Sequence, residues 1–201
     1  MVKNRYYITA GVLIMFCAMA LIGGCTLFNN KHTGDINRGV VEKKKIAICP
    51  VDAGIYGNTT NQLDSILEKI IMKQEREQVV SCSYVSQKLT KDKTLQDKYN
   101  RYYSMLSVLS FSDERLIADI GEAFGCDFLL FPIVEYWGHT IEDKKEYAKV
   151  ALKFIIVDTH SGKVVWRSMQ NDKARNMFGK ADLEQVATAL AKSMLLKRVY
   201  E

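Results

Sequence analysis

Side chains that could support chemistry are few and scattered in this chain. Its five cysteines and three histidines occur at spacings that match neither a CxxC pair nor a zinc-binding motif. No serine lies in a GxSxG elbow, and no cysteine has a histidine partner suggested by the local sequence. The carboxylates of Asp52, Asp127, Glu135 and Asp158 could meet in space, but carboxylates in turns and at strand ends are more often solvated. The sequence therefore predicts a protein that is not an enzyme and has no metal or cofactor.

One glycine-bearing loop, residues 52–58, follows an apolar strand pattern and precedes a helical pattern. In α/β folds, ligands bind at the carboxyl ends of the strands, next to the N-termini of the helices that follow. The segment Gly54–Gly57 is neither GxGxxG nor a P-loop, and the glycine-lysine pair at Gly162 lacks the other residues of a P-loop. Nucleotide binding is therefore not expected. A small ligand-binding or hydrolytic protein that uses the 52–58 loop is the alternative function.

Cys25 is the cysteine whose surroundings indicate a specific reaction. Lys3 and Arg5 precede an uncharged run, residues 6–30, and two glycines stand directly before the cysteine, which is the pattern of an export signal. The tetrapeptide Ile22-Gly23-Gly24-Cys25 resembles the lipobox of bacterial lipoproteins. This resemblance implies that residues 1–24 are a signal peptide cut before Cys25. It also implies that the thiol of Cys25 receives a diacylglycerol and that the new amino terminus is acylated.

The lipobox resemblance also predicts where the protein resides. The residue after the cysteine is Thr26 rather than Asp, which implies transfer to the outer membrane, facing the periplasm, in a host with two membranes. A host with a single membrane would carry the protein on the outer face of that membrane. The alternative is an uncleaved anchor, because the run is long enough to span a bilayer as a helix of about 20 residues. Both alternatives export the rest of the chain.

Length and composition predict one domain after a tether. Residues 25–43 are polar and lack apolar periodicity, so we expect a lipidated N-terminus and a tether of about 25 Å as a flexible coil. Residues 44–201 are enough for a single α/β domain with a sizeable core. The formal net charge of +5 is too small a basic bias to indicate nucleic acid as a partner.

Apolar periodicity predicts a mixed α/β (α+β) domain with a three-layer-like arrangement. It starts as strand-helix-strand-helix, continues through a central buried strand and an antiparallel hairpin, and closes with an amphipathic helix. Thr59 with Gln62 fits a capping box, Ser112 is expected to cap a later helix, and Pro132 predicts a bulge or an unpaired position in its strand. The predicted strands are 46–51, 79–82, 126–137, 147–157 and 163–168, and the helices start near 59, 84, 91, 112 and 182.

Three further cysteines of the exported chain, Cys49, Cys82 and Cys126, have two possible states. An exported chain can oxidise a pair, and Cys49 with Cys126 is the first candidate because both lie in or beside apolar strands. The alternative is three small buried thiols, which is how free cysteines usually behave in cores.

Several of these patterns together resemble a known domain. They are the strand ending in Pro50, the helix ending in Ala123-Phe124-Gly125, the run 126–130, and the hairpin 157–166 around Ser161-Gly162. The chain resembles, over roughly residues 44–199, the small α/β domain shared by the curli secretion-channel lipoprotein, the lipoprotein activators of penicillin-binding proteins and the amino-terminal domain of the Tol-system periplasmic protein. A pore is not expected, because the two additional hairpins of the channel are missing from the pattern. The short tether likewise disfavours an activator that reaches across the wall.

The helical pattern between residues 91 and 110 carries a tyrosine stripe. Tyr99 and Tyr103 are four residues apart with Tyr102 beside them, so the three rings share one helix face. They either pack on the sheet or form a partner-binding surface, since tyrosines are enriched at interfaces. The resulting hypothesis is a membrane-anchored envelope lipoprotein that acts as a protein-interaction or accessory module of an envelope assembly or secretion system. It would have an unidentified protein partner and could form a homo-oligomer.

Overall fold

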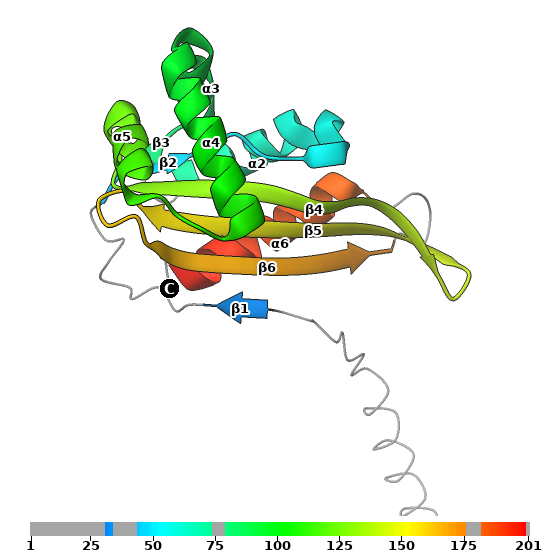
Figure 1. The fold of residues 1–201 in the computed structure, drawn as a ribbon. Coiled ribbons are helices and arrows are strands. Elements are labelled where there is room, and N and C mark those ends of the chain that lie inside the picture. The colour runs from blue at the N-terminus through cyan, green and yellow to red at the C-terminus, as the bar shows by residue number, and fades with distance from the viewer. Residues whose placement is uncertain (1–30, 34–43, 74–78, 176–181, 200–201) are drawn as a thin grey trace, which may run out of the picture.

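The computed structural model describes residues 31–33, 44–73, 79–175 and 182–199. Its central element is a mixed six-stranded sheet (Figure 1). The strand order is β1-β6-β5-β4-β2-β3. The predicted α/β class is confirmed. The strands are β1 (Lys31–Thr33), β2 (Ile46–Ile48), β3 (Val79–Val80), β4 (Phe128–Glu142), β5 (Lys145–Asp158) and β6 (Val164–Ala174).

Helices cover both faces of this sheet (Figure 1). On one face, α2 (Thr60–Met72) and α6 (Leu183–Val199) pack on the strands through aliphatic side chains. On the other face lie α3 (Cys82–Lys91), α4 (Lys93–Leu109) and α5 (Glu114–Phe124). The expected three layers are therefore present.

The short strand β2 is parallel to both of its neighbours, β3 and β4. Its side chains alternate between the two cores, with Ile46 and Ile48 on the α2 and α6 side and Ala47 on the α3 to α5 side. All three are buried, as expected for a strand covered on both faces. After β2 the chain turns through a 3-10 helix, η2 (Gly54–Thr59), into α2.

Two antiparallel hairpins form the longer half of the sheet. The β5–β6 hairpin was predicted and is confirmed. The β4–β5 hairpin was not predicted, because β4 continues five residues past Trp137 to Glu142. Its two-residue turn places Asp143 and Lys144 at φ of 49° and 60°, which is the backbone of a type I′ turn and matches the twist of the strands.

Pro132 occupies a position where its missing N–H is tolerated. It lies between Leu130, the last β4 residue paired with β2, and the isolated bridge from Ile133 to Asp52. Pro132 is nevertheless paired, opposite Phe154 of β5, and its carbonyl accepts from the N–H of Asp52 at 3.0 Å. The strand does carry a bulge, but it falls between Val134 and Tyr136. Proline is confined to such interruptions because it cannot donate a ladder hydrogen bond.

Two of the predicted helix caps are wrong in detail. The hydroxyl of Thr59 donates to the carbonyl of Tyr56 at 2.8 Å instead of capping α2, because η2 already leads into that helix. Helix α5 is capped by Asp113 rather than Ser112, with Asp113 Oδ1 accepting from the N–H of Leu116 at 3.0 Å. The predicted stop at Gly125 is confirmed, and its φ of 64° is the left-handed conformation that favours glycine.

The segment predicted as a tether is described only at Lys31–Thr33, where it forms β1 and pairs antiparallel with β6. A strand was not expected there. The predicted signal peptide, residues 1–24, and the predicted lipidation site, Cys25, lie outside the described residues. Among the helices that the structure describes, none is long and apolar enough to span a bilayer.

Candidate functional site

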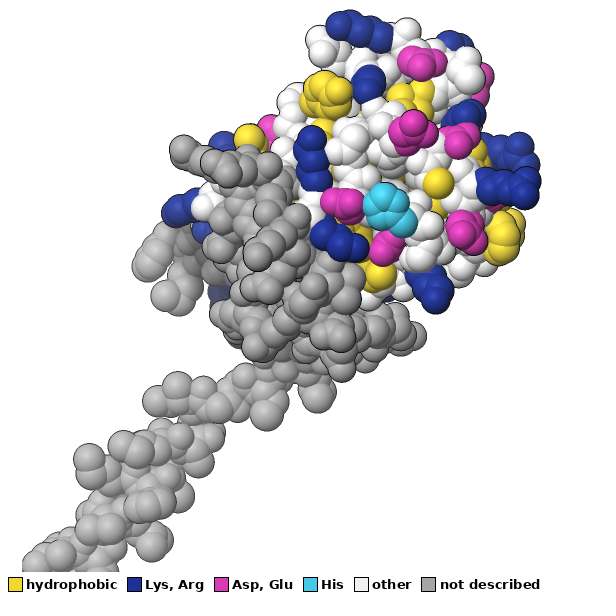
Figure 2. Space-filling view, turned by 90° about the vertical axis from the view of Figure 1, so that its left-hand side faces the viewer, with side chains coloured by type: hydrophobic (Ala, Val, Ile, Leu, Met, Phe, Trp, Pro, Cys, Tyr) yellow, Lys and Arg dark blue, Asp and Glu magenta, His cyan; other side chains and the backbone are white. Residues whose placement is uncertain are grey.

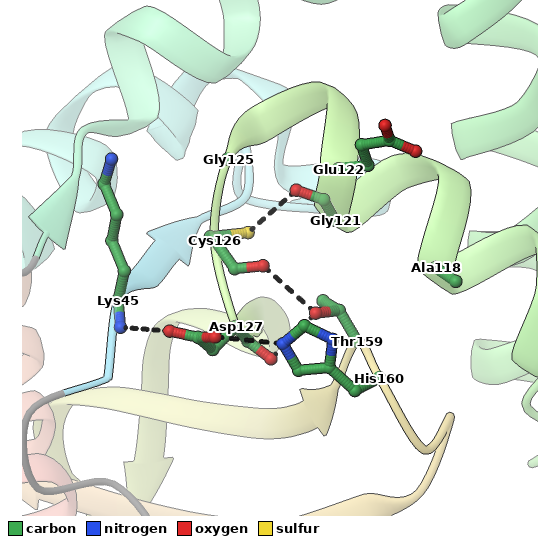
Figure 3. A pocket seen from close by; sticks show the side chains of 9 residues that line it. All are labelled: Lys45, Ala118, Gly121, Glu122, Gly125, Cys126, Asp127, Thr159 and His160. Carbon is green, nitrogen blue, oxygen red and sulfur yellow. Dashed lines mark hydrogen bonds and ion pairs between the residues drawn. The ribbon is translucent and has the colours of Figure 1, made fainter.

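A pocket of about 560 Å³ lies at the end of the sheet where β2 and β4 begin and β5 ends (Figure 3). Lys45 stands directly before β2, Asp127 directly before β4, and Thr159 and His160 directly after β5. Helix α5 forms the opposite wall. The lining residues are Lys45, Ala118, Gly121, Glu122, Gly125, Cys126, Asp127, Thr159 and His160.

Asp127 is the centre of the polar contacts in this pocket. Its Oδ2 accepts a hydrogen bond from the backbone N–H of Lys45 at 2.8 Å, and its Oδ1 lies 2.9 Å from Nε2 of His160 (Figure 3). The hydrogen bond with His160, followed by that from Lys45, lowers the pKa of Asp127. Figure 2 shows this end of the molecule, where a histidine is flanked by acidic and basic side chains.

The contact between Asp127 and His160 was not predicted from the sequence, which gave no sign that these two residues lie close together. The pairing register explains their proximity, because Phe128 at the start of β4 is opposite Asp158 at the end of β5. The residues just outside this pair, Asp127 and His160, must then lie near each other. An explicit prediction of the β4–β5 hairpin would have been the signal needed to find them.

Thr159 connects the pocket to the core. Its hydroxyl lies 3.0 Å from the carbonyl oxygen of Cys126 and 2.9 Å from that of Asp127, and the residue is buried. A Cβ added to Gly121 of α5 would lie 2.4 Å from the Cβ of Thr159. Only glycine therefore allows α5 to pack this closely on the β5–β6 turn.

The chemistry available in the pocket is limited by these contacts. A carboxylate paired with an imidazole can orient a general base, but the hydroxyl of Thr159 is directed at backbone carbonyls. Burial raises the pKa of the Cys126 thiol to about 12, so this sulfur remains protonated near neutral pH. Within the described ranges, no group of three His, Cys, Asp or Glu residues could hold a metal ion.

The 52–58 loop, on which the alternative function depends, lies at the opposite end of β2. Asp52 holds it in place, since its Oδ1 accepts from the N–H of Gly54 at 2.9 Å and its Oδ2 accepts from the hydroxyl of Tyr103. Ile55, the second residue of η2, is almost fully exposed. The polar atoms of Asp52 are thus used to fix the loop against α4.

The predicted partner surface formed by Tyr99, Tyr102 and Tyr103 is wrong for the first two residues. Tyr99 and Tyr102 are buried against Phe131 of β4, with ring centroids 6.1 and 5.8 Å from its ring. The hydroxyl of Tyr102 shares a 2.6 Å hydrogen bond with Ser112. Tyr103 is half-buried and bonds to Asp52. The stripe packs on the sheet, which was the other interpretation of the pattern.

The three cysteines of the domain are free thiols, and all are buried. Burial raises the pKa of Cys49 well above its usual value and that of Cys82 to about 12. The proposed Cys49–Cys126 disulfide is therefore wrong for this structure, and the alternative of three buried thiols is correct.

Among the solved structures that are similar to this chain, two PelC dodecamers have TM-scores above 0.5. The PelC dodecamer from Paraburkholderia phytofirmans has a TM-score of 0.54 and 13% identity, covering 84% of this chain and 95% of that chain. A substituted PelC dodecamer from the same organism has a TM-score of 0.51 and 16% identity, covering 83% and 94%. Lipoprotein GNA1162 from Neisseria meningitidis has a TM-score of 0.47 and 14% identity, covering 77% and 99%.

At these identities the likeness to PelC establishes a shared fold. No protein-family model matches the chain, and no curated protein matches it.

Proposed function

We propose that this chain is a lipid-anchored protein of the bacterial envelope that works as a non-catalytic accessory module and assembles into a homo-oligomer. The lipid is attached to Cys25, and the domain faces the periplasm from the outer membrane in a host with two membranes. The assembly part of the proposal rests on the likeness in fold to the PelC dodecamer, which extends over 84% of this chain and 95% of that one. The anchor part rests on the resemblance of Ile22-Gly23-Gly24-Cys25 to a lipobox.

The polar contacts of the pocket support a non-catalytic role. Asp127 bonds to the backbone of Lys45 and to His160, and Thr159 bonds to two backbone carbonyls. These side chains join the starts of β2 and β4 to the β5–β6 turn. The hydroxyl of Thr159 already donates to backbone carbonyls and burial raises the pKa of the Cys126 thiol, so neither of these two groups is an activated nucleophile.

Lipidation is tested by labelling cells that express the full chain with a fatty acid carrying a detectable tag. We expect label on the unsubstituted protein and on Cys17→Ser, a matched control from the same uncharged run. Cys25→Ser should remain an unlabelled precursor of higher mass, because a thioether can form only through that sulfur. Label and trimming retained in Cys25→Ser would contradict the anchor.

Assembly is tested on the full-length protein extracted from envelopes in a mild detergent. Native mass spectrometry should give the mass of two or more whole protomers. Chemical cross-linking in intact envelopes should give a series of bands that all contain this chain. A single protomer mass together with no cross-linked ladder would contradict the homo-oligomer.

A further inference from the structure

We infer that a small apolar patch beside β6 docks on the phospholipid bilayer that holds the anchor. The patch consists of Val108 and Leu109 at the end of α4, Phe111 after it, and Met169 with Arg167 on β6. This inference rests on the proposed lipidation of Cys25 and adds to it a fixed orientation of the domain relative to the membrane.

The pairing of β1 brings the patch close to the anchor. In the β1–β6 register, Lys31 is opposite Met169 and Thr33 is opposite Arg167. Cys25 stands six residues before Lys31, so the lipidated sulfur lies at most ~20 Å from the start of β1 even in a fully extended chain. The β6 side of the sheet must therefore stay near the bilayer surface, whereas a free tether of residues 25–43 would leave the domain free to turn.

Three exposed apolar side chains lie within four residues at the end of α4, and a fourth lies on β6. Val108 is 78% exposed, Leu109 69% and Phe111 56%, and Met169 on β6 is 40% exposed. Ser110 ends α4 in the left-handed conformation, at φ of 54°, and turns the chain so that Phe111 does not continue the buried helix face. Clustered exposed apolar side chains of this kind mark an interaction surface.

Arg167 joins the two parts of the patch and adds a positive charge. Its Nη1 lies 3.5 Å from Oγ of Ser110, and its Nε is buried with no hydrogen-bond partner among the described residues. In the part of the chain that the structure describes, no carboxylate lies within ion-pair distance of Arg167. The carboxylate of Asp113, three residues after Ser110 in the chain, caps α5. A guanidinium next to apolar side chains matches the phosphate layer of a bilayer above its acyl chains.

The size of the patch favours a bilayer over a second copy of the chain. Stable protein interfaces use about 20–30 residues on each side, and this patch has five. Shallow insertion of a few apolar side chains is sufficient for a surface that a covalent anchor already holds at the membrane, because the anchor removes most of the entropic cost of docking.

The experiment places a tryptophan reporter in the patch of the full-length lipidated protein. Phe111→Trp is reconstituted into vesicles of phosphatidylcholine and phosphatidylglycerol whose acyl chains carry bromine near the headgroup. We expect its emission to shift to shorter wavelength and to be strongly quenched, relative to the unsubstituted protein with Trp137 and Trp166. Ile55→Trp is the matched control, since Ile55 is 92% exposed but lies on η2, and its emission should stay that of a solvated ring.

The outcomes separate this inference from the proposed function. Equal quenching of both reporters, or none of Phe111→Trp in a lipidated sample, overturns the docking surface and leaves the anchor intact. An emission at short wavelength that bromine does not quench means that protein covers the patch, which also overturns it. Absence of label at Cys25 overturns the anchor and the inference together. If Phe111→Trp does not fold, Leu109→Trp replaces it.

Arg167→Gln gives a second, independent readout. Combined with the Phe111→Trp reporter, it should weaken quenching in vesicles that contain phosphatidylglycerol. Lys173→Gln, a cation already paired with Glu142, is the control and should leave quenching unchanged. Equal quenching in both combined variants contradicts a role for Arg167.

Discussion

The two faces of the sheet are covered to different extents, and β5 shows where the difference begins. Its α2 and α6 face carries five buried apolar side chains along the whole strand. On its other face Lys149, the buried Ala151 and Lys153 precede Ile155 and Val157, and only the last two belong to the core under the α3 to α5 layer. The change from lysine to isoleucine therefore marks the edge of a helix layer within a single strand.

The two cores also differ in chemistry. The α2 and α6 side is almost entirely apolar and combines aliphatic side chains with the aromatic rings of Phe128, Phe154 and Trp166. The α3 to α5 side buries tyrosines and thiols, whose polar atoms need partners. The hydroxyl of Tyr102 shares a hydrogen bond with that of Ser112, and burial raises the pKa of Tyr102 to about 12. The stability of an apolar core depends mainly on how well its volume is filled, whereas the stability of this second core depends on volume and on specific hydrogen bonds.

The largest expected effect is at Phe154, on the fully covered face of β5. Phe154→Ala should lower the free energy of unfolding by about 3–5 kcal/mol, because it removes a buried ring and leaves a cavity. Lys153→Ala, one residue away on the partly covered face, should change it by less than about 1 kcal/mol, since its contact with Glu135 is a long, partly exposed ion pair at 3.8 Å. Urea unfolding measures both. Similar losses in the two variants would mean that the faces do not differ as described.

The next effect concerns the contact that holds α5 on the sheet. Gly121→Ala places a Cβ against Thr159, so the helix or the β5–β6 turn must move, at a cost of about 1–3 kcal/mol. Gly57→Ala is the control, because nothing lies within 4 Å of the added Cβ there and its φ is not in the left-handed range. Thermal unfolding of both variants is the measurement. A melting temperature of Gly121→Ala equal to that of Gly57→Ala would contradict the close approach.

Sequence reasoning recovered most of the fold because the relevant signals are local. Apolar periodicity predicted the strand at 147–157 and the helices that start near 59, 112 and 182. The boundary errors have local causes as well: Asp113 competes with Ser112 for the same cap, and η2 replaces the expected loop before α2. The length of β4 was underestimated because its second half is polar on the side that no helix covers.

The sites were harder to predict because they depend on distant pairings. Asp127 and His160 are 33 residues apart and meet only through the β4–β5 register. The tyrosine stripe had two interpretations because a ring that packs on a sheet and a ring at an interface follow the same spacing along a helix. Only the position of Phe131 beneath the rings decides between them. The pairing of β1 with β6 could not be predicted either, because a strand of three residues is too short to show an apolar pattern.

A smaller effect tests the hydrogen bonds of the second core. Tyr102→Phe should lower the free energy of unfolding by about 1 kcal/mol, because it keeps the packing against Phe131 and removes the bond to Ser112. Tyr84→Phe, at an exposed position on α3, should have almost no effect. Chemical denaturation of Tyr102→Phe, Ser112→Ala and the double variant forms a cycle. Additive losses in that cycle would show that the two hydroxyls do not interact.

The smallest expected effect is a pH dependence at the end of the sheet that α5 covers. The hydrogen bond with His160 lowers the pKa of Asp127 in the fold, so the carboxylate form is favoured over that in the unfolded chain. Its contribution is therefore fully present above about pH 4, the ordinary aspartate pKa, and is lost as the pH falls through the lowered value. Because Asp127 is partly exposed, we expect Asp127→Asn to cost less than about 1 kcal/mol at pH 7. The difference between the two proteins should shrink on acidification.

Asp97→Asn, in an exposed pair with Lys93 on α4, is the control for charge removal. Urea unfolding at several pH values between 2 and 7 measures both variants, and a constant difference for Asp127→Asn over this range would mean that its carboxylate does not hold the β5–β6 turn.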